Sequence, residues 1–287
     1  MSSDPDPEDL RADLRDLWER SASGWGERAA AVREWGMPVS SAMIDRLNLQ
    51  PGQRVLELAA GPGDTGFLAA EIVAPGGGVV ISSDGAQAMV EVARRRAQEL
   101  GIRGVEFRQL ELELIDRTTA DVDRILCRWG LMLIVDPAAC LTECRRVLRP
   151  GGRIALAVWD APEANPWMSL PRQALADVAP SAVGPPAAGP GPFALASAEQ
   201  VRELLEAAGF FEVTVEAVEL VRQVEAPERF LEETLSLSEA FRRAWDELDG
   251  AARDRLTERM RELCAPLAGP DGIARIRGRS LVAAASA

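Results

Sequence analysis

Three glycines and two carboxylates form the pattern in this chain that most directly indicates chemistry. Gly61, Gly63 and Gly66 have the spacing G-x-G-x-x-G, directly after an apolar segment at residues 54–59. Glycines let a ligand approach the backbone closely, and a helix that begins there offers free N–H groups. Asp84 ends the next apolar segment, where a carboxylate can accept hydrogen bonds from both hydroxyls of a ribose. The pattern predicts a site for a cofactor that contains a nucleoside.

Two classes of cofactor fit this turn: a nicotinamide or flavin dinucleotide, and an adenosyl cofactor such as S-adenosylmethionine. Glu57 lies in the apolar segment just before the glycines. A carboxylate there is unfavourable beside a pyrophosphate and favourable beside an ammonium or sulfonium. Methyl transfer from a sulfonium needs little besides positioning, whereas hydride transfer usually needs a proton donor. The residues favour S-adenosylmethionine and leave an NAD(P)-dependent reductase as the weaker alternative.

Three residue types are missing from the sequence. All 32 basic residues are arginine, and there is no lysine, histidine or tyrosine. This excludes Ser-His-Asp triads, Cys-His dyads, Schiff-base lysines and histidine metal sites. Strong codon bias and deliberate reduction of the alphabet both explain it. A non-catalytic S-adenosylmethionine-binding protein, or an engineered one that folds without turnover, therefore stays open as an alternative.

Charge and cysteine content limit the partners. The net charge is −13 and the isoelectric point is near 4.7, which argues against nucleic acid or an anionic membrane surface. Cys127, Cys140, Cys144 and Cys264 form no C-x-x-C pair, so we expect free core thiols in a reducing cytoplasm and no metal. The acidic N-terminus lacks the apolar region of a signal peptide, and no apolar stretch reaches the roughly 18 residues of a membrane span. We expect a cytoplasmic monomer or homodimer.

The glycine turn needs a sheet to position it. Short segments at residues 54–59, 79–82, 105–109, 122–127 and 154–158, most of them apolar runs, predict five strands. Helical patterns separate most of them, and this alternation is typical of a parallel, doubly wound sheet. The ligand of such a sheet lies at the carboxyl ends of its strands.

The flanks follow other patterns. Helix is expected over most of residues 1–50 and 228–265, a long loop over 160–194, and further strands at 213–221 and 273–284. We therefore expect a Rossmann-like α/β fold: a mostly parallel seven-stranded sheet with an antiparallel edge strand and a helical cap. Residues 1–50 would form the cap, 51–160 the cofactor-binding core, and 161–287 the rest of the sheet with a helical insertion near 228–265. Residues 8–34 and the insertion would together cover the crevice, with Trp18 and Trp25 closing over the acceptor.

Three segments carry a family resemblance. Val55-Leu-Glu-Leu-Ala-Ala-Gly-Pro-Gly63 resembles the first motif of class I S-adenosylmethionine-dependent methyltransferases. Ser83-Asp84-Gly-Ala-Gln-Ala-Met89-Val-Glu-Val-Ala-Arg94 is similar to their second motif, and Leu148-Arg-Pro-Gly-Gly152 to the turn before their fifth strand. The nearest branch contains small-molecule enzymes related to the ubiquinone and menaquinone biosynthesis C-methyltransferases. The resemblance covers about residues 35–160 and indicates the cofactor far more than the acceptor.

The resemblance implies roles for individual residues. Gly61 and Gly63 would face the methionine part of the cofactor, with Glu57 near its ammonium. Asp84 would hold the ribose, and Met89 would pack on the adenine. Glu111 and Leu112 stand where the family usually has an aspartate and a smaller residue beside the adenine amine. The full cofactor set is Glu57, Ala59, Gly61, Gly63, Asp84, Gly85, Met89, Glu111, Leu112 and Arg128.

The acceptor side is less defined. Its candidates are Trp25, Trp129, Met132 and Trp159, with Trp167 beside them, although tryptophan and methionine also fill cores. Arg128 suits an acceptor carboxylate and equally an ion pair with an acid of the cap. No general base stands out. Asp136, Asp160 and Glu163 follow the fourth and fifth strands, and an acceptor that is already acidic needs no base.

Overall fold

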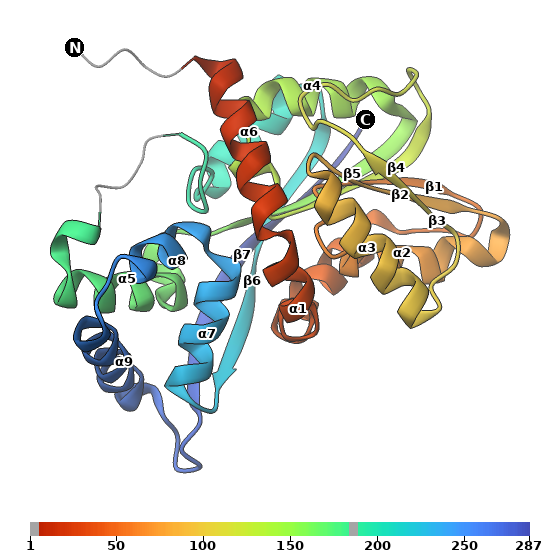
Figure 1. The fold of residues 1–287 in the computed structure, drawn as a ribbon. Helices are drawn as coiled ribbons and strands as arrows, with labels where there is room; N and C mark the ends of the chain where they lie inside the picture. The colour runs from red at the N-terminus through yellow and green to blue at the C-terminus, as the bar shows by residue number, and fades with distance from the viewer. Residues whose placement is uncertain (1–5, 184–188) are drawn as a thin grey trace.

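One sheet of seven strands runs through the part of the chain described by the computed structural model, residues 6–183 and 189–287 (Figure 1). Its spatial order is β3-β2-β1-β4-β5-β7-β6. The strands are β1 (Arg54–Leu58), β2 (Val79–Asp84), β3 (Val105–Gln109), β4 (Val122–Arg128), β5 (Leu148–Trp159), β6 (Phe211–Val224) and β7 (Ala274–Ser286). The chain order reverses between β1 and β4, and this is the switch point at which doubly wound sheets bind ligands.

The strand directions confirm the expected mixed sheet. Strands β1 to β5 pair in parallel, and β7 pairs antiparallel with both β5 and β6. The antiparallel strand therefore lies one position in from the edge, and β6 forms the edge itself. The central strands β1 and β4 read as apolar runs because helices cover both of their faces.

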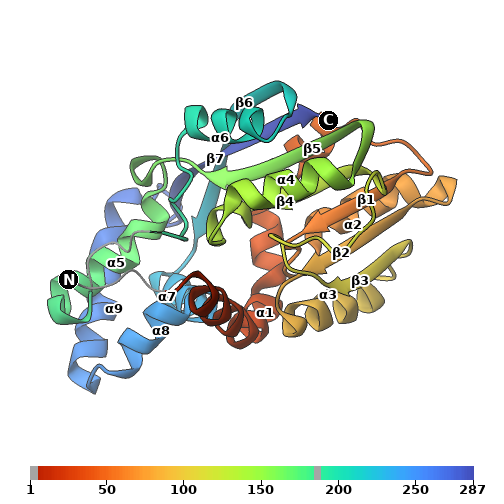
Figure 2. The ribbon, with the colours of Figure 1, turned by 90° about the horizontal axis from the view of Figure 1, so that it is seen from above.

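Helices cover the sheet in two layers (Figure 2). Helices α1 (Pro7–Leu47), α2 (Asp64–Val73) and α3 (Gln87–Leu100) pack together on one face, and α4 (Pro137–Val147) and α6 (Ala198–Ala207) on the other. The remaining helices are α5 (Pro166–Val178), α7 (Pro227–Leu237), α8 (Glu239–Asp246) and α9 (Gly250–Cys264). They gather at the far ends of the long strands β6 and β7, away from α2 and α3 (Figure 1). No helix in the described residues is long and apolar enough to span a bilayer.

The N-terminal region is a single helix of 41 residues. Asp6 caps its first turn by accepting the N–H of Glu8. At its other end Met43 and Leu47 are fully buried in the main core, which anchors the helix to the sheet. The first half of α1 thus projects from a fixed base across the carboxyl ends of the strands.

One expectation for the C-terminal half was wrong. Residues 160–194 contain helix α5 in place of a continuous loop, because Leu170, Ala174 and Leu175 form a buried stripe despite the many prolines and glycines. Residues 184–188 of that segment lie outside the described residues. The helical stretch at 228–265 is divided into three helices. Ser238 and Asp249 break it, since each caps the helix that follows.

A buried ion pair joins these added helices to the sheet. Arg222 on β6 is only 4% exposed, and its guanidinium lies 2.7 Å from the carboxylate of Glu233 on α7. Trp35, Trp167 and Phe230 surround the guanidinium at 5.1, 4.6 and 5.0 Å from their ring centroids. The charge is held in an almost fully desolvated setting, so it depends on its one carboxylate.

Glu233→Gln should lower the free energy of unfolding by about 3 kcal/mol, because it leaves the Arg222 charge buried without its counter-ion. Urea denaturation measures this change. Glu225→Gln is the matched control, since the Glu225–Arg229 pair is exposed on both sides and should contribute less than about 1 kcal/mol. Equal losses in the two variants would contradict the role given to the buried pair.

Candidate functional site

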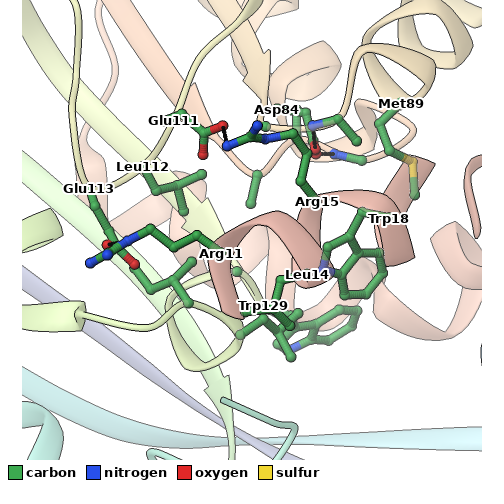
Figure 3. Close-up of a pocket in the computed structure, with 18 of the residues that line it drawn as sticks. Arg11, Leu14, Arg15, Trp18, Asp84, Met89, Glu111, Leu112, Glu113 and Trp129 are labelled. Atoms are coloured by element: carbon green, nitrogen blue, oxygen red, sulfur yellow. Dashed lines mark hydrogen bonds and ion pairs between the residues drawn. The ribbon is translucent and has the colours of Figure 1, made fainter. Parts of the chain in front are cut away.

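A cavity of about 450 Å³ opens at the carboxyl ends of β1, β2 and β4 (Figure 3). Its floor is made by the segments that follow four strands, at residues 59–62, 84–86, 111–114 and 128–130. The N-terminal half of α1 forms the opposite wall. The volume lies within the range of small-molecule sites, which is roughly 300–1,000 Å³.

Glu57 lies at the base of the cavity and is 3% exposed. The N–H of Gly66 donates to its Oε1 at 2.6 Å, and the hydroxyl of Ser82 donates to its Oε2 at 3.0 Å. A Cβ on residue 66 would lie 2.0 Å from Oε2, so only glycine lets the carboxylate reach the first turn of α2. The third glycine of the motif is therefore required by Glu57.

Burial raises the pKa of Glu57 to about 8, against the opposing effect of its two hydrogen bonds. At neutral pH the carboxyl group is mostly protonated. A cation placed beside it would favour the ionised form and draw the proton off. Such a group suits an ammonium and does not suit a pyrophosphate.

Asp84 ends β2 and joins two ligand-facing loops. Its Oδ2 accepts the N–H of Gly61 at 2.9 Å, and its Oδ1 accepts the N–H of Ala86 at 3.1 Å. Burial raises its pKa to about 6, with smaller contributions from the negative charges of Glu19 and Glu111. The carboxylate lines the cavity while it fixes the loop after β1, in the place where a ribose would need acceptors.

Strained backbone is found at the same edge of the sheet. Ala59 and Trp129 have φ angles of 49° and 59°, in the left-handed region that non-glycine residues rarely occupy. They follow the neighbouring strands β1 and β4, and a Cβ on Gly130 would lie 2.3 Å from the Cβ of Ala59. Strain of this kind, held by surrounding structure, is typical of functional sites.

Most of the sequence-predicted residues come together in the cavity wall. Those that line it are Glu57, Ala59, Gly61, Asp84, Gly85, Met89, Glu111, Leu112, Arg128, Trp25 and Trp129. Trp25 meets Trp18 edge to face, with ring centroids 6.0 Å apart. Trp18 and Trp25 lie on the α1 side of the cavity and pack against Ala86 and Met89, whereas Trp129 lies on the floor, so aromatic rings and carboxylates line the same cavity from both sides.

Other predicted residues are not among those that line the cavity. Gly63 has a φ of 91°, and a Cβ there would meet the Phe67 ring at 2.5 Å, so this glycine shapes the turn and the start of α2. Met132 is buried in the core, and Trp159 stacks on Trp129 at 4.2 Å, behind the cavity. Trp167 packs around Arg222. The suggested bases Asp136, Asp160 and Glu163 do not line the cavity either.

Three polar contacts that fasten α1 over the cavity, made by Arg11, Arg15 and Glu19, were not predicted from the sequence. Arg11 pairs with Glu113, and Arg15 lies 2.7 Å from Glu111 (Figure 3). Glu19 accepts the N–H groups of Gln87 and Ala88 at 2.6 and 2.9 Å, and so caps α3, which has no capping side chain of its own. Residues 11, 15 and 19 are spaced by four, so all three contacts lie on one face of α1. That spacing was visible in the sequence, but the partner residues were not.

The insertion does not cover the cavity as expected. None of the described residues 228–265 lines it. Helix α7 instead supports α1 from behind, where Trp35 Nε1 donates to Glu233 at 3.4 Å and Arg28 Nε donates to Ser236 at 3.3 Å. The cap over the cavity is therefore α1, with the insertion behind it.

Comparison with known proteins assigns the chain to a family. A model of the methyltransferase domain matches residues 49–209, which is more than half of the 287 residues. The chain belongs to the methyltransferase-domain family. The match includes β1 to β5 and the whole floor of the cavity. The expectation of a class I methyltransferase related to the ubiquinone and menaquinone enzymes is confirmed.

Two curated relatives and two solved structures illustrate the similarity. The methyltransferase is 37% identical over 170 residues to an uncharacterised 37.1 kDa protein in a Streptomyces fradiae transposon, covering 51% of this chain and 47% of that protein. It is 35% identical over 124 residues to the ubiquinone/menaquinone biosynthesis C-methyltransferase of Coxiella burnetii, covering 43% and 49%. The chain thus spans about half the length of these relatives.

Among solved structures, the YcgJ protein of Bacillus subtilis superimposes with a TM-score of 0.58 at 20% identity, covering 86% of this chain and 97% of that one. Phosphoethanolamine N-methyltransferase 2 of Haemonchus contortus, solved with S-adenosylhomocysteine, gives a TM-score of 0.56 at 18% identity, covering 95% and 60%. At sequence identities of 20% and 18%, the structural similarity shows that the chain shares the fold of these two proteins.

The cofactor expected of a methyltransferase domain is S-adenosylmethionine. The residues present fit it, since Glu57 offers a buried carboxyl to a cationic amino-acid end and Asp84 offers a carboxylate at the ribose position. Met89 and Leu112 supply apolar surface beyond Asp84, where an adenine would extend.

Glu57 should release its proton when S-adenosylhomocysteine, the demethylated form of the cofactor, binds. The pKa near 8 means that the site must lose nearly a full proton at pH 7 to face an ammonium, so affinity for S-adenosylhomocysteine should rise as the pH increases from about 6 to 8. Calorimetry at pH 7 in buffers of different ionisation enthalpy measures the proton count.

In Glu57→Gln the release should disappear. Titration with 5′-methylthioadenosine, which has no ammonium, should release no proton from either protein. Equal proton release by the wild type and the Gln variant would show that another group titrates.

Asp84→Ala should weaken S-adenosylhomocysteine binding by about 1–3 kcal/mol, the scale for losing charge-assisted hydrogen bonds and the ordering of Gly61. Asp116→Ala is the control, because this acid is exposed and outside the cavity wall. Calorimetry compares both variants with the wild type. An unchanged affinity in Asp84→Ala would mean that the carboxylate serves the loops alone.

Proposed function

We propose that this methyltransferase transfers the methyl group of S-adenosylmethionine to a small molecule, by in-line displacement and mainly through positioning. The observation that carries the proposal is the shared cavity, in which Glu57 and Asp84 and several aromatic side chains face one space. The aromatic side chains are Trp18 and Trp25 on α1 and Trp129 after β4.

The size and cover of the cavity support a small acceptor. A volume of about 450 Å³ must hold the reacting parts of cofactor and acceptor together. Helix α1 lies across the opening and is fastened at three points, to Glu113, to Glu111 and to the start of α3. A macromolecule would have to displace this helix, whereas a small molecule fits beneath it. The net charge of −13 further disfavours a nucleic acid.

Catalysis by positioning the cofactor and the acceptor needs only side chains that hold ligands, and the cavity supplies these. Bound S-adenosylmethionine supplies a methyl group on a sulfonium, whose neutral thioether leaves readily. Glu57 is fixed by a hydrogen bond from Gly66, and Asp84 by a hydrogen bond from Gly61. A ligand that contacts both carboxyl groups is therefore held in one orientation. Helix α1, fastened by Arg11, Arg15 and Glu19, keeps water away from the reacting atoms.

The carboxylates of the cavity supply no free general base near its centre. Glu111 and Glu113 are paired with arginines, and Glu57 and Asp84 accept hydrogen bonds from the chain. Glu8 lies in the exposed first turn of α1. We propose that the acceptor needs no base, as expected of a carboxylate, an acidified phenol or an enolised carbon.

We also propose that the enzyme works in the cytoplasm. All four cysteines are free and buried, which suits a reducing compartment.

A labelling experiment tests the small-molecule proposal. Purified enzyme and methyl-labelled S-adenosylmethionine are incubated with a metabolite panel and with a cell extract, and products are identified by mass spectrometry. Label should enter the low-molecular-weight fraction, and Asp84→Ala should slow its entry at least about fivefold at limiting cofactor. Label confined to protein or RNA would contradict a small acceptor. Binding of the cofactor with no label transferred would support the non-catalytic alternative.

A further inference from the structure

Arg128 is a cation of the cavity wall that has no ion-pair partner. It ends β4, and its guanidinium lies 4.5 Å from the centroid of the Trp129 ring. Its Nη1 is buried and forms no hydrogen bond. Among the ion pairs of the described residues, none includes Arg128. A buried charged donor without an acceptor is unfavourable, so its position calls for a ligand.

Helix α1 makes room for the Arg128 side chain at Gly36, which has no side chain of its own. A Cβ on Gly36 would lie 2.7 Å from Nη1 of Arg128 and 3.2 Å from the Trp129 ring. Any other residue at position 36 would press on the guanidinium. The helix thus accommodates an arginine that makes no ion pair with the chain itself.

The carboxylates that act most strongly on Arg128 form no ion pair with it, although Oδ2 of Asp64 is buried without a hydrogen-bond partner. Asp64 lies 2.8 Å from the guanidinium of Arg96, and Glu57 accepts hydrogen bonds from Gly66 and Ser82. Burial lowers the pKa of Arg128, and the attraction of Asp64 and Glu57 offsets that effect only in part. The guanidinium therefore stays cationic and incompletely neutralised.

The other arginines of the cavity differ from Arg128 in this respect. Arg11 and Arg15 lie at the mouth, and each is paired with a glutamate, Glu113 and Glu111. Arg128 lies deeper, near Glu57, so a guanidinium and a carboxyl group that a cation would ionise line the same part of the cavity. A guanidinium fork binds a carboxylate through two parallel hydrogen bonds.

We propose that Arg128 is a carboxylate-binding subsite of this cavity. The carboxylate comes either from the amino-acid end of the cofactor, whose ammonium would then face Glu57, or from the methyl acceptor. Only the second source rests on the proposed function. In both cases the Arg128 guanidinium binds an anionic oxygen beside the Trp129 ring.

Binding measurements without turnover distinguish the two sources. Calorimetry compares wild type, Arg128→Gln and Arg128→Lys with S-adenosylhomocysteine, which has the carboxylate, and 5′-methylthioadenosine, which does not. If the cofactor supplies the carboxylate, Arg128→Gln should weaken S-adenosylhomocysteine binding about tenfold or more and leave 5′-methylthioadenosine binding unchanged. Arg128→Lys should restore part of the loss, since it keeps the charge and loses the fork.

Benzoate and benzamide test the acceptor as the source. Each is titrated into protein saturated with S-adenosylhomocysteine. If the acceptor supplies the carboxylate, wild type should bind benzoate more tightly than benzamide, and Arg128→Gln should lose that preference while keeping its affinity for S-adenosylhomocysteine.

Arg95→Gln is the control variant, because Arg95 is exposed on α3, and circular dichroism checks the fold of each protein. Two results would overturn the proposal. One is equal loss of affinity for S-adenosylhomocysteine and 5′-methylthioadenosine, which would mean that Arg128 only supports the structure around Asp64. The other is no change with any of the four ligands. Since the first arm needs no acceptor, failure of the labelling experiment leaves it intact.

Discussion

The site depends on one buried carboxyl group, that of Glu57, against the start of α2. The contact requires a glycine at position 66, since a Cβ would lie 2.0 Å from Oε2, and a hydroxyl at Ser82 on the neighbouring strand. It ties β1, β2 and α2 together at the point where the cofactor must lie. Because burial keeps the group mostly protonated at neutral pH, the free protein avoids holding a bare charge there, and a cationic ligand supplies the partner that stabilises the ionised form.

The sequence predicted the core of the fold because its signals are local. Most strands from β1 to β5 contain a short apolar run next to a turn, and the glycine motif places Glu57 and Asp84 near strand ends without any knowledge of distant contacts. The antiparallel strand was also foreseen, though not its place between β5 and β6. Helix α5 was missed because its prolines and glycines suggested a loop, while its buried stripe has a partner only in the tertiary structure.

The acceptor side was predicted less well for a physical reason. A tryptophan after a strand looks alike in sequence whether it faces a cavity or packs behind one, and Trp129 and Trp159 take these two different places. Likewise, Arg11, Arg15 and Glu19 read as an ordinary solvated helix face until their partners on the segments after β2 and β3 are known. Gly63 resembled a ligand-facing residue, yet its neighbour is Phe67. Contacts between segments far apart in sequence decide the first two cases, and a contact within the first turn of α2 concerns the third.

The length of α1 has a consequence for how such an enzyme can diversify. One end of the helix walls the cavity, its middle rests on α7 through Trp35 and Glu233, and its last turns are fixed in the core by Met43 and Leu47. The cofactor loops belong to a separate part of the chain. Mutations in the insertion therefore reach the cavity through α1, without contacting the loop after β1. In evolutionary terms, the insertion offers a route by which distant substitutions reshape the cavity while the glycine motif keeps its sequence.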